Sequence, residues 1–253
     1  MTTKIALVTG GSRGLGKDMA IQIAKKGIDV ILTFRENEGA ARETVKAIGD
    51  LGRNAAMLHL DMNDLHSLDP FIGRVRELLR STWNTDSFDF LINNAGMGAT
   101  VPFEKVTEQL FDQFLNVHFK GVYFLTQKSI PLLNRGGSVI NISTGTTRYS
   151  NPGYSVYASM KGAVEVLTKY LAKELGEKGI RANVVAPGPV ETDFNGAAIR
   201  NNPQLKAHLS SLSPLGRVGD PVDDIGPVVA WLCTDEARWI NGQRIEASGG
   251  YLV

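Results

Sequence analysis

Cysteine is almost absent from this sequence. Cys233 is the only one among 253 residues, which excludes internal disulfides and cysteine-based metal motifs. The segment that follows Met1 also lacks the charged region and the apolar stretch of a signal peptide. We therefore expect a cytoplasmic protein in which Cys233 is a small buried residue.

Long apolar runs and an excess of one charge are lacking too. No run of about 18 apolar residues occurs, so we expect no membrane-spanning helix. The 27 basic residues balance 26 acidic ones without a clustered basic stripe, which argues against nucleic acid or an anionic membrane as a partner. No metal is expected either, because the histidines lack metal-ligand spacing and read as structural or solvated: His59, His66, His118 and His208.

The apolar residues that are present make up 43% of the chain and form an alternating pattern. Short β-branched runs predict seven strands: 5–9, 30–34, 55–60, 88–93, 138–143, 182–186 and 244–246. Helical patterns lie between them, the longest at 107–133 and 154–177. We predict one α/β domain over 1–253, a Rossmann fold with a doubly wound, mostly parallel seven-stranded sheet and helices on both faces. The segment 191–217 lacks strong periodicity and is expected to form a substrate lid.

A glycine-rich turn follows the first predicted strand and leads into a helical pattern. Its spacing is Gly-x-x-x-Gly-x-Gly. Glycines let the backbone approach a dinucleotide pyrophosphate closely, and the amino end of the following helix favours its negative charge. The turn residues expected to bind a cofactor are Gly10, Ser12, Arg13, Gly14, Leu15 and Gly16.

Several ordered motifs resemble one enzyme family. After the glycine turn come Asn93-Asn94-Ala95-Gly96, Tyr157 to Lys161, Pro187-Gly188 and Ser248-Gly249-Gly250. This order resembles the short-chain dehydrogenase/reductase family over essentially the whole chain. The resemblance implies an oxidoreductase that moves a hydride between nicotinamide and the carbon of a carbonyl or secondary alcohol.

The end of the second predicted strand indicates which dinucleotide is used. NAD sites usually place an acidic residue there, whereas NADP sites place an arginine that meets the 2′-phosphate. Here the strand ends in Thr33-Phe34-Arg35, and Arg13 offers a second guanidinium from the glycine turn. We expect NADP(H), with NAD(H) as the alternative.

The resemblance assigns further cofactor contacts. Asp61 matches the carboxylate that holds the adenine amino group, with Met62 beside it, although Asp61 also suits a helix cap. Around the adenosine ribose we expect Asn93, Ala95 and Gly96, which would also stabilise the sheet. The residues expected toward nicotinamide are Pro187, Gly188, Val190 and Thr192.

Tyr157 and Lys161 are candidate catalytic residues. Four residues apart on a predicted helix, they share one face. A phenol has a pKa of about 10, and a nearby ammonium favours its ionised form and lowers that value. In the resembled family the tyrosine exchanges a proton with the substrate oxygen, and the lysine also holds the nicotinamide ribose.

A hydroxyl at the end of the fifth strand is the third expected member. The family count places it at Thr144, where relatives carry serine, while the neighbouring Ser143 is the alternative. Such a donor stabilises the charge that develops on the substrate oxygen. Asn116 matches a family asparagine whose helix irregularity supports a water between the lysine and solvent.

Three matters stay open at this stage. The substrate is a small carbonyl or alcohol of unknown identity, and 3-oxoacyl-[acyl-carrier-protein] reduction is one alternative because Arg135 and Lys178 fall near basic positions of such reductases. A non-catalytic NADP(H)-binding sensor is the alternative of another class. The resemblance also implies a homotetramer or homodimer built through the two long helices and the C-terminal segment.

Overall fold

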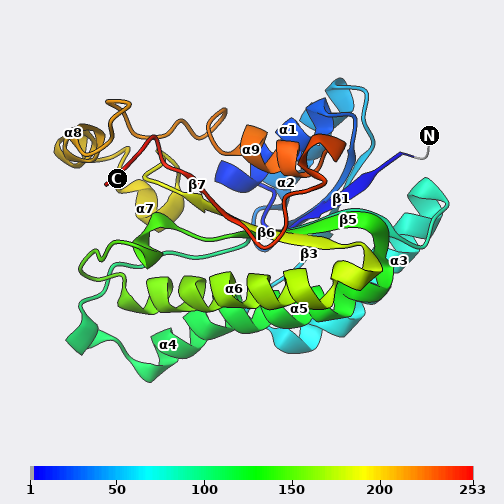
Figure 1. Cartoon of the computed structure of the whole chain (residues 1–253), viewed down its shortest axis with the longest axis horizontal. Helices are drawn as coiled ribbons and strands as arrows, with labels where there is room; N and C mark the ends of the chain where they lie inside the picture. The colour runs from blue at the N-terminus through cyan, green and yellow to red at the C-terminus, as the bar shows by residue number, and fades with distance from the viewer. Residues whose placement is uncertain (1–2, 253) are drawn as a thin grey trace.

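Seven parallel strands run through the centre of the protein (Figure 1). The structure is a computed structural model that describes residues 3–252. The strands are β1 (Ile5–Val8), β2 (Asp29–Phe34), β3 (Ala55–His59), β4 (Phe88–Asn93), β5 (Leu133–Ile142), β6 (Arg181–Pro187) and β7 (Arg244–Ala247). Their order in the sheet is β3-β2-β1-β4-β5-β6-β7, so the winding direction reverses between β1 and β4. The predicted doubly wound sheet is confirmed.

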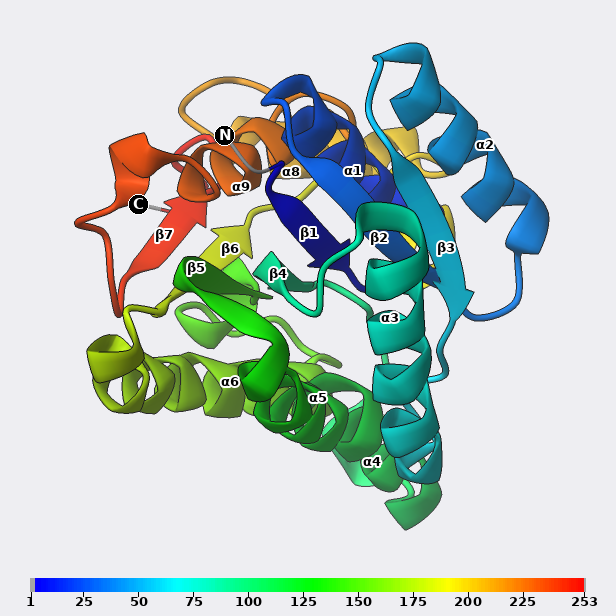
Figure 2. The ribbon, with the colours of Figure 1, turned by 90° about the vertical axis from the view of Figure 1, so that its right-hand side faces the viewer.

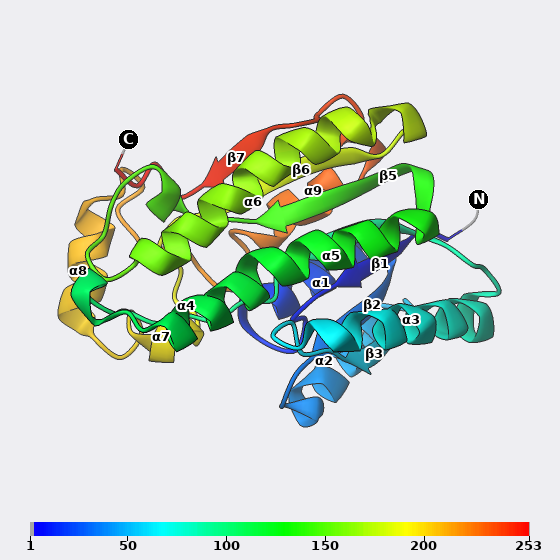
Figure 3. The same ribbon diagram turned by 90° about the horizontal axis from the view of Figure 1, so that it is seen from below.

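Helices cover both faces of this sheet (Figure 2). One face carries α1 (Gly14–Lys25), α2 (Glu38–Asp50) and α9 (Gly226–Leu232). The other carries α3 (Leu68–Trp83), α4 (Glu108–Leu115), α5 (Gly121–Ser129) and α6 (Ser155–Glu174), as the view from below in Figure 3 shows. Two short helices, α7 (Phe194–Ala197) and α8 (Pro203–Ser211), lie beyond the sheet, at the left of Figure 1. Single 3-10 turns occupy 65–67, 103–105, 130–132, 145–147, 176–178 and 235–237.

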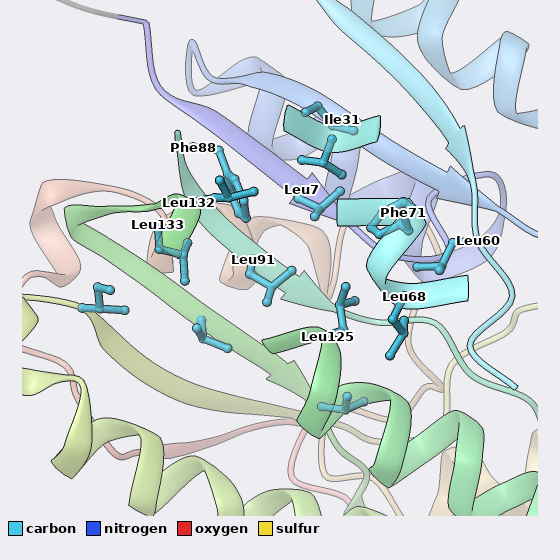
Figure 4. Packing of buried hydrophobic residues seen from close by; sticks show 14 of the residues in the cluster. Leu7, Ile31, Leu60, Leu68, Phe71, Phe88, Leu91, Leu125, Leu132 and Leu133 are labelled. Carbon is cyan, nitrogen blue, oxygen red and sulfur yellow. The ribbon is translucent and has the colours of Figure 1, made fainter. Parts of the chain in front are cut away.

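Strand alternation divides the core into two layers. In β1, Ile5 and Leu7 belong to one apolar cluster, whereas Ala6 and Val8 belong to the other. Successive side chains of a strand point to opposite faces, so a parallel sheet covered on both sides needs apolar residues at every position. Figure 4 shows the first cluster, where Leu7 and its neighbours meet Phe71 of α3. Each such buried side chain contributes roughly 1.5–3 kcal/mol to the hydrophobic stabilisation.

Two segments differ from their sequence predictions. The pattern at 107–133 is not one helix, because a π-helical turn, η3 (Asn116–Lys120), separates α4 from α5. The segment 191–217, predicted without periodicity, contains α7 and α8. Within residues 3–252, no helix has both the length and the apolar character that a membrane crossing requires.

Candidate active site

The motif residues gather along one edge of the sheet. Because all the strands are parallel, their carboxyl ends meet there, on either side of the reversal between β1 and β4. Ligands of open α/β sheets bind at such a point. The segments that follow the strands at this edge are 9–16, 35–37, 60–64, 94–98, 143–147 and 187–192.

The glycine turn has the close packing that its spacing predicts. Gly10 and Gly14 have φ angles of +66° and +52°, which side chains rarely tolerate. A Cβ on Gly16 would lie 2.1 Å from the carbonyl oxygen of Gly10, so only glycine fits there. Sequence reasoning missed Asn94, whose Nδ2 donates to the carbonyl oxygen of Thr9 over 2.8 Å and so ties the turn to β4. Its place inside the 93–96 motif was the available signal.

The two arginines lie at the entrance to this turn. The amide of Gly11 donates to the carbonyl oxygen of Thr33 over 2.9 Å, which joins the turn to the end of β2. Arg13 and Arg35 each lie two residues beyond this link. Both are exposed, and the Arg35 side chain pairs with Glu36 at 2.5 Å. Two exposed arginines thus belong to the two segments that this hydrogen bond joins.

The residues expected around adenosine divide into surface and core groups. Asp61 is half-buried, and its Oδ1 accepts the amide of Asn63 over 2.9 Å. Met62 is buried in the core, and so is Asn93, whose Nδ2 donates to Asn141 over 2.8 Å. The side chains of Met62 and Asn93 therefore stabilise the core, and only the backbone of these residues can contact a cofactor. The remaining positions are half-buried, except that Pro187 is buried and Gly96 is exposed: Ser12, Leu15, Ala95, Gly96, Pro187 and Gly188.

On the nicotinamide side, the chain after β6 turns back toward the glycine turn. Thr192 lies next to Gly14, whose added Cβ would be 3.9 Å from the Thr192 Cβ. Val190 forms a parallel bridge with Gly219, which fixes the start of the predicted lid. Thr192 therefore lies beside the glycine turn, and Val190 two residues earlier is held by its bridge.

Tyr157 and Lys161 lie on one face of α6, turned toward the end of β5. Lys161 is 4% exposed, and its Nζ donates to the carbonyl oxygen of Ile142 over 2.6 Å. The same Nζ lies 5.9 Å from the centre of the Tyr157 ring. Burial lowers the pKa of Lys161 to about 8. The spacing of four residues thus brings the two groups together as expected.

The direction of the Tyr157 pKa differs from the sequence argument. Burial raises it above the ordinary value of 10.0, a hydrogen bond with Thr144 acts in the opposite direction, and the nearby Tyr154 raises it further. Desolvation of the phenolate is the largest effect. Tyr157 is therefore protonated in this structure, the form in which a phenol can donate a proton.

The two candidate hydroxyls have different partners. Ser143 is 2% exposed, and its Oγ donates to Glu165 over 2.6 Å. Thr144 is on the Tyr157 side, where its side chain acts to lower the pKa of the phenol. Its Oγ1 also accepts the amide of Thr146 over 3.3 Å. Successive residues at a strand end face opposite ways, so only one of the two can serve the site.

A buried histidine lies against Tyr157, and sequence reasoning gave it no place in the site. The rings of His118 and Tyr157 are 5.1 Å apart in an edge-to-face arrangement. Burial first, and then the charge of Lys161, lower the pKa of His118 to about 3. Its Nε2 lies 2.8 Å from the carbonyl oxygen of Met97. His118 belongs to the π-helical turn that starts at Asn116, the position of the expected helix irregularity, while the Asn116 side chain faces Asn63 at 3.4 Å.

The predicted lid covers the aromatic cluster. The Phe194 ring lies 5.7 Å from that of Tyr157. Asn195 Nδ2 donates to Thr100 over 2.8 Å and to the Tyr154 hydroxyl over 3.1 Å. An apolar recess borders Tyr157; its lining residues include Ala99, Val101, Leu110, Phe114 and Val156. Among the described residues, no three His, Cys, Asp or Glu side chains cluster as metal ligands would.

Known proteins match this chain along nearly its whole length. The family model described as enoyl-(acyl carrier protein) reductase matches residues 10–252. The tetrahydroxynaphthalene reductase PfmaG of Pestalotiopsis fici is 32% identical over 98% of this chain and 91% of its own length. The reductase LugOII, which catalyses a keto-reduction in lugdunomycin biosynthesis, has a TM-score of 0.94 and 34% identity over 100% of this chain and 99% of that one. The angucycline C-6 ketoreductase LanV with bound NADP has a TM-score of 0.93 and 34% identity over 99% of this chain and 96% of that one. A second LanV structure holds both NADP and rabelomycin.

Proposed function

This chain belongs to the short-chain dehydrogenase/reductase family, and on that basis we propose that it reduces the ketone of a flat aromatic substrate with NADPH. It is an oxidoreductase, and its cofactor is NADP(H). The observation that carries the proposal is the juxtaposition of Tyr157, Thr144 and Lys161 under an aromatic lid, at the carboxyl edge of the sheet.

The residues at the edge fit the cofactor. Gly16 lets α1 begin directly against Gly10 of the turn, and the amino end of α1 would favour the pyrophosphate. Arg13 and Arg35 would bind the 2′-phosphate, which competes with Glu36 for the Arg35 guanidinium. Asp61, Val190 and Thr192 would contact the two ends of the dinucleotide. When bound, the nicotinamide supplies the hydride that reaches the carbonyl carbon.

The protein supplies the proton and the orientation. Tyr157, protonated because it is buried, donates its proton to the carbonyl oxygen as that oxygen gains negative charge. The hydroxyl of Thr144 donates a hydrogen bond to the same oxygen and stabilises the developing charge. Lys161 is held by the carbonyl oxygen of Ile142 and lies close to the Tyr157 ring. After Tyr157 has given up its proton, a proton of the Lys161 ammonium can restore the phenol. Asn116 and its π-helical turn support the route to solvent.

The aromatic surroundings support an aromatic substrate. The rings of Phe114, His118 and Phe194 lie within 6.5, 5.1 and 5.7 Å of the Tyr157 ring, measured between centroids. Phe114 and His118 are buried behind Tyr157, whereas the exposed Phe194 ring offers a flat, apolar wall on which a fused-ring ketone can stack. The relatives PfmaG and LanV are named for such substrates.

Acyl carrier protein as the partner has less support. Arg135, one of the two basic residues that suggested it, donates to the carbonyl oxygen of Glu177 over 3.2 Å and packs against Gly179. That guanidinium is therefore used by the fold. The family model is described as an enoyl reductase, so reduction of a carbon–carbon double bond is the second activity to test.

We also propose that the protein is cytoplasmic and assembles as a homotetramer or homodimer through α5 and α6. Apolar side chains on these helices are exposed: Tyr123, Phe124, Val166 and Tyr170, at 41%, 37%, 54% and 62%. Neighbouring exposed apolar residues on two helices mark a surface that a second copy can cover.

The test is NADPH oxidation, followed at the nicotinamide absorbance, with hydroxynaphthalenones, angucycline-type ketones, 3-oxoacyl thioesters and enoyl thioesters. We expect turnover with the fused-ring ketones that Tyr157→Phe abolishes while NADPH still binds. Turnover only with thioesters would overturn the substrate class. NADPH binding without turnover of any member would favour a sensor, and undiminished turnover in Tyr157→Phe would contradict the mechanism.

A further inference from the structure

A charged network lies directly behind Thr144. Glu165 follows Lys161 by one helical turn on α6, and its Oε1 accepts hydrogen bonds from Ser143 (2.6 Å) and Thr147 (2.8 Å). Arg244 of β7 donates to the same oxygen through Nε, over 2.9 Å. The carboxylate of Glu165 thus joins residues on both sides of Thr144 to a strand that is 100 residues away in the chain.

Arg244 also contacts the backbone of Thr144. One terminal nitrogen donates to the carbonyl oxygen of Thr144 over 3.1 Å and to the Thr147 hydroxyl over 3.2 Å. The other donates to Glu246 over 2.9 Å. The guanidinium therefore uses its Nε and both terminal nitrogens at once, which a lysine ammonium cannot reproduce because it is a single point of charge.

The network is shielded from solvent. The side chains of Arg244, Glu165 and Glu246 are 13%, 17% and 18% exposed. Hydrogen bonds with charged partners in such surroundings are shorter and stronger than neutral ones, so they hold their partners firmly. The 143–147 turn is therefore fixed at the Ser143 and Thr147 hydroxyls and at the carbonyl oxygen of Thr144, by groups from α6 and β7.

We propose that Glu165 and Arg244 are positioning residues that orient Thr144 toward Tyr157. This inference rests on the proposed function, since it concerns the hydroxyl assigned there to the substrate oxygen. Arg244 fixes the carbonyl of Thr144, and Glu165 engages Ser143 and Thr147 on either side. The Thr144 hydroxyl, which the network does not use, accepts two long contacts of 3.3 Å from Thr146 and lies on the side of Tyr157.

The first test is Arg244→Lys, which keeps the positive charge but loses the planar guanidinium that donates from three nitrogens. A misplacement of about 1 Å can slow an enzyme by about a hundredfold, so we expect kcat to fall at least tenfold while KM for NADPH changes by less than about twofold. Arg148→Lys is the matched control: Arg148 also pairs with Glu246, at 2.8 Å, but is 60% exposed. It should keep its kcat. Glu165→Gln, which retains the oxygen acceptor, carries the same test should Arg244→Lys fold poorly.

A double-mutant cycle with Thr144→Val separates positioning from general damage. If Arg244 acts through Thr144, adding Arg244→Lys to Thr144→Val lowers kcat no further. If the losses of kcat in the two single variants multiply in the double variant, the inference is wrong. It is also wrong if Arg244→Lys keeps the wild-type kcat while Thr144→Val is slow. Full turnover in Thr144→Val itself would instead overturn the role of Thr144 in the proposed function, and this inference with it.

Discussion

The choice between the two neighbouring hydroxyls gives the sharpest prediction. Thr144→Val removes the hydroxyl that faces Tyr157 and keeps the shape of the side chain. Ser143→Ala removes the hydroxyl that donates to Glu165 over 2.6 Å. We expect opposite outcomes: the first change lowers turnover with little effect on stability, and the second lowers stability with little effect on turnover.

The magnitudes follow from the contacts. Loss of one donor to a developing oxyanion costs about a hundredfold in kcat or more, and the only backbone contact of the Thr144 hydroxyl is a long one of 3.3 Å. For Ser143→Ala, a hydrogen bond to a charged group is worth about 1.5–3 kcal/mol. Glu165 keeps Thr147 and Arg244 as donors, so the lower end, about 1.5 kcal/mol, is expected. In a chain of this length that corresponds to a Tm lower by roughly 3–6 °C.

Steady-state kinetics with the best ketone of the panel and thermal unfolding of the same preparations measure both quantities. KM for NADPH should stay near its original value in both variants, because neither hydroxyl lies at the glycine turn. Wild-type kcat in Thr144→Val, together with a large loss in Ser143→Ala, would refute the assignment. It would mean that the strand end rotates when substrate binds.

Three further predictions concern the cofactor, stability and assembly. Arg35→Ala should raise KM for NADPH about tenfold or more and leave KM for NADH nearly unchanged, whereas Arg42→Ala, another exposed arginine, should alter neither. Asp18 is 5% exposed, and burial raises its pKa from 3.8 to about 6. The folded state therefore holds this proton more tightly, and about 3 kcal/mol of stability present below pH 4 is lost as the pH rises through 6. Urea unfolding at both ends of that range should show this loss in the wild type but not in Asp18→Asn. Tyr170→Glu should reduce the molecular mass seen by sedimentation; Leu51→Glu, also at an exposed apolar residue, should not.

Local sequence signals predicted the strands and the long helices, but not the π-helical turn or the short helices of the lid. β-branched runs located all seven strands because a parallel sheet buried on both faces is apolar throughout. The π-helical turn at Asn116–Lys120 left no trace in the apolar period, because one extra residue in a helix hardly changes that period, and only the family resemblance indicated an irregularity at Asn116. The lid helices α7 and α8 lack a buried stripe, since they pack by a few contacts such as Phe194 on Gly98. Those contacts are set by tertiary structure.

The orientation of the strand end was also beyond the sequence, but part of it was readable. Motif spacing left Ser143 and Thr144 open because alternation sends adjacent side chains to opposite faces, and only a partner shows which face is which. That partner is Glu165, four residues after Lys161 and eight after Tyr157, hence on the same face of α6. A carboxylate at this spacing needs a donor, and Ser143 supplies one at 2.6 Å. Continuing the Tyr-x-x-x-Lys stripe by one turn thus favours Thr144 as the hydroxyl left for Tyr157, whereas Arg244, separated from Glu165 by 79 residues, required the fold.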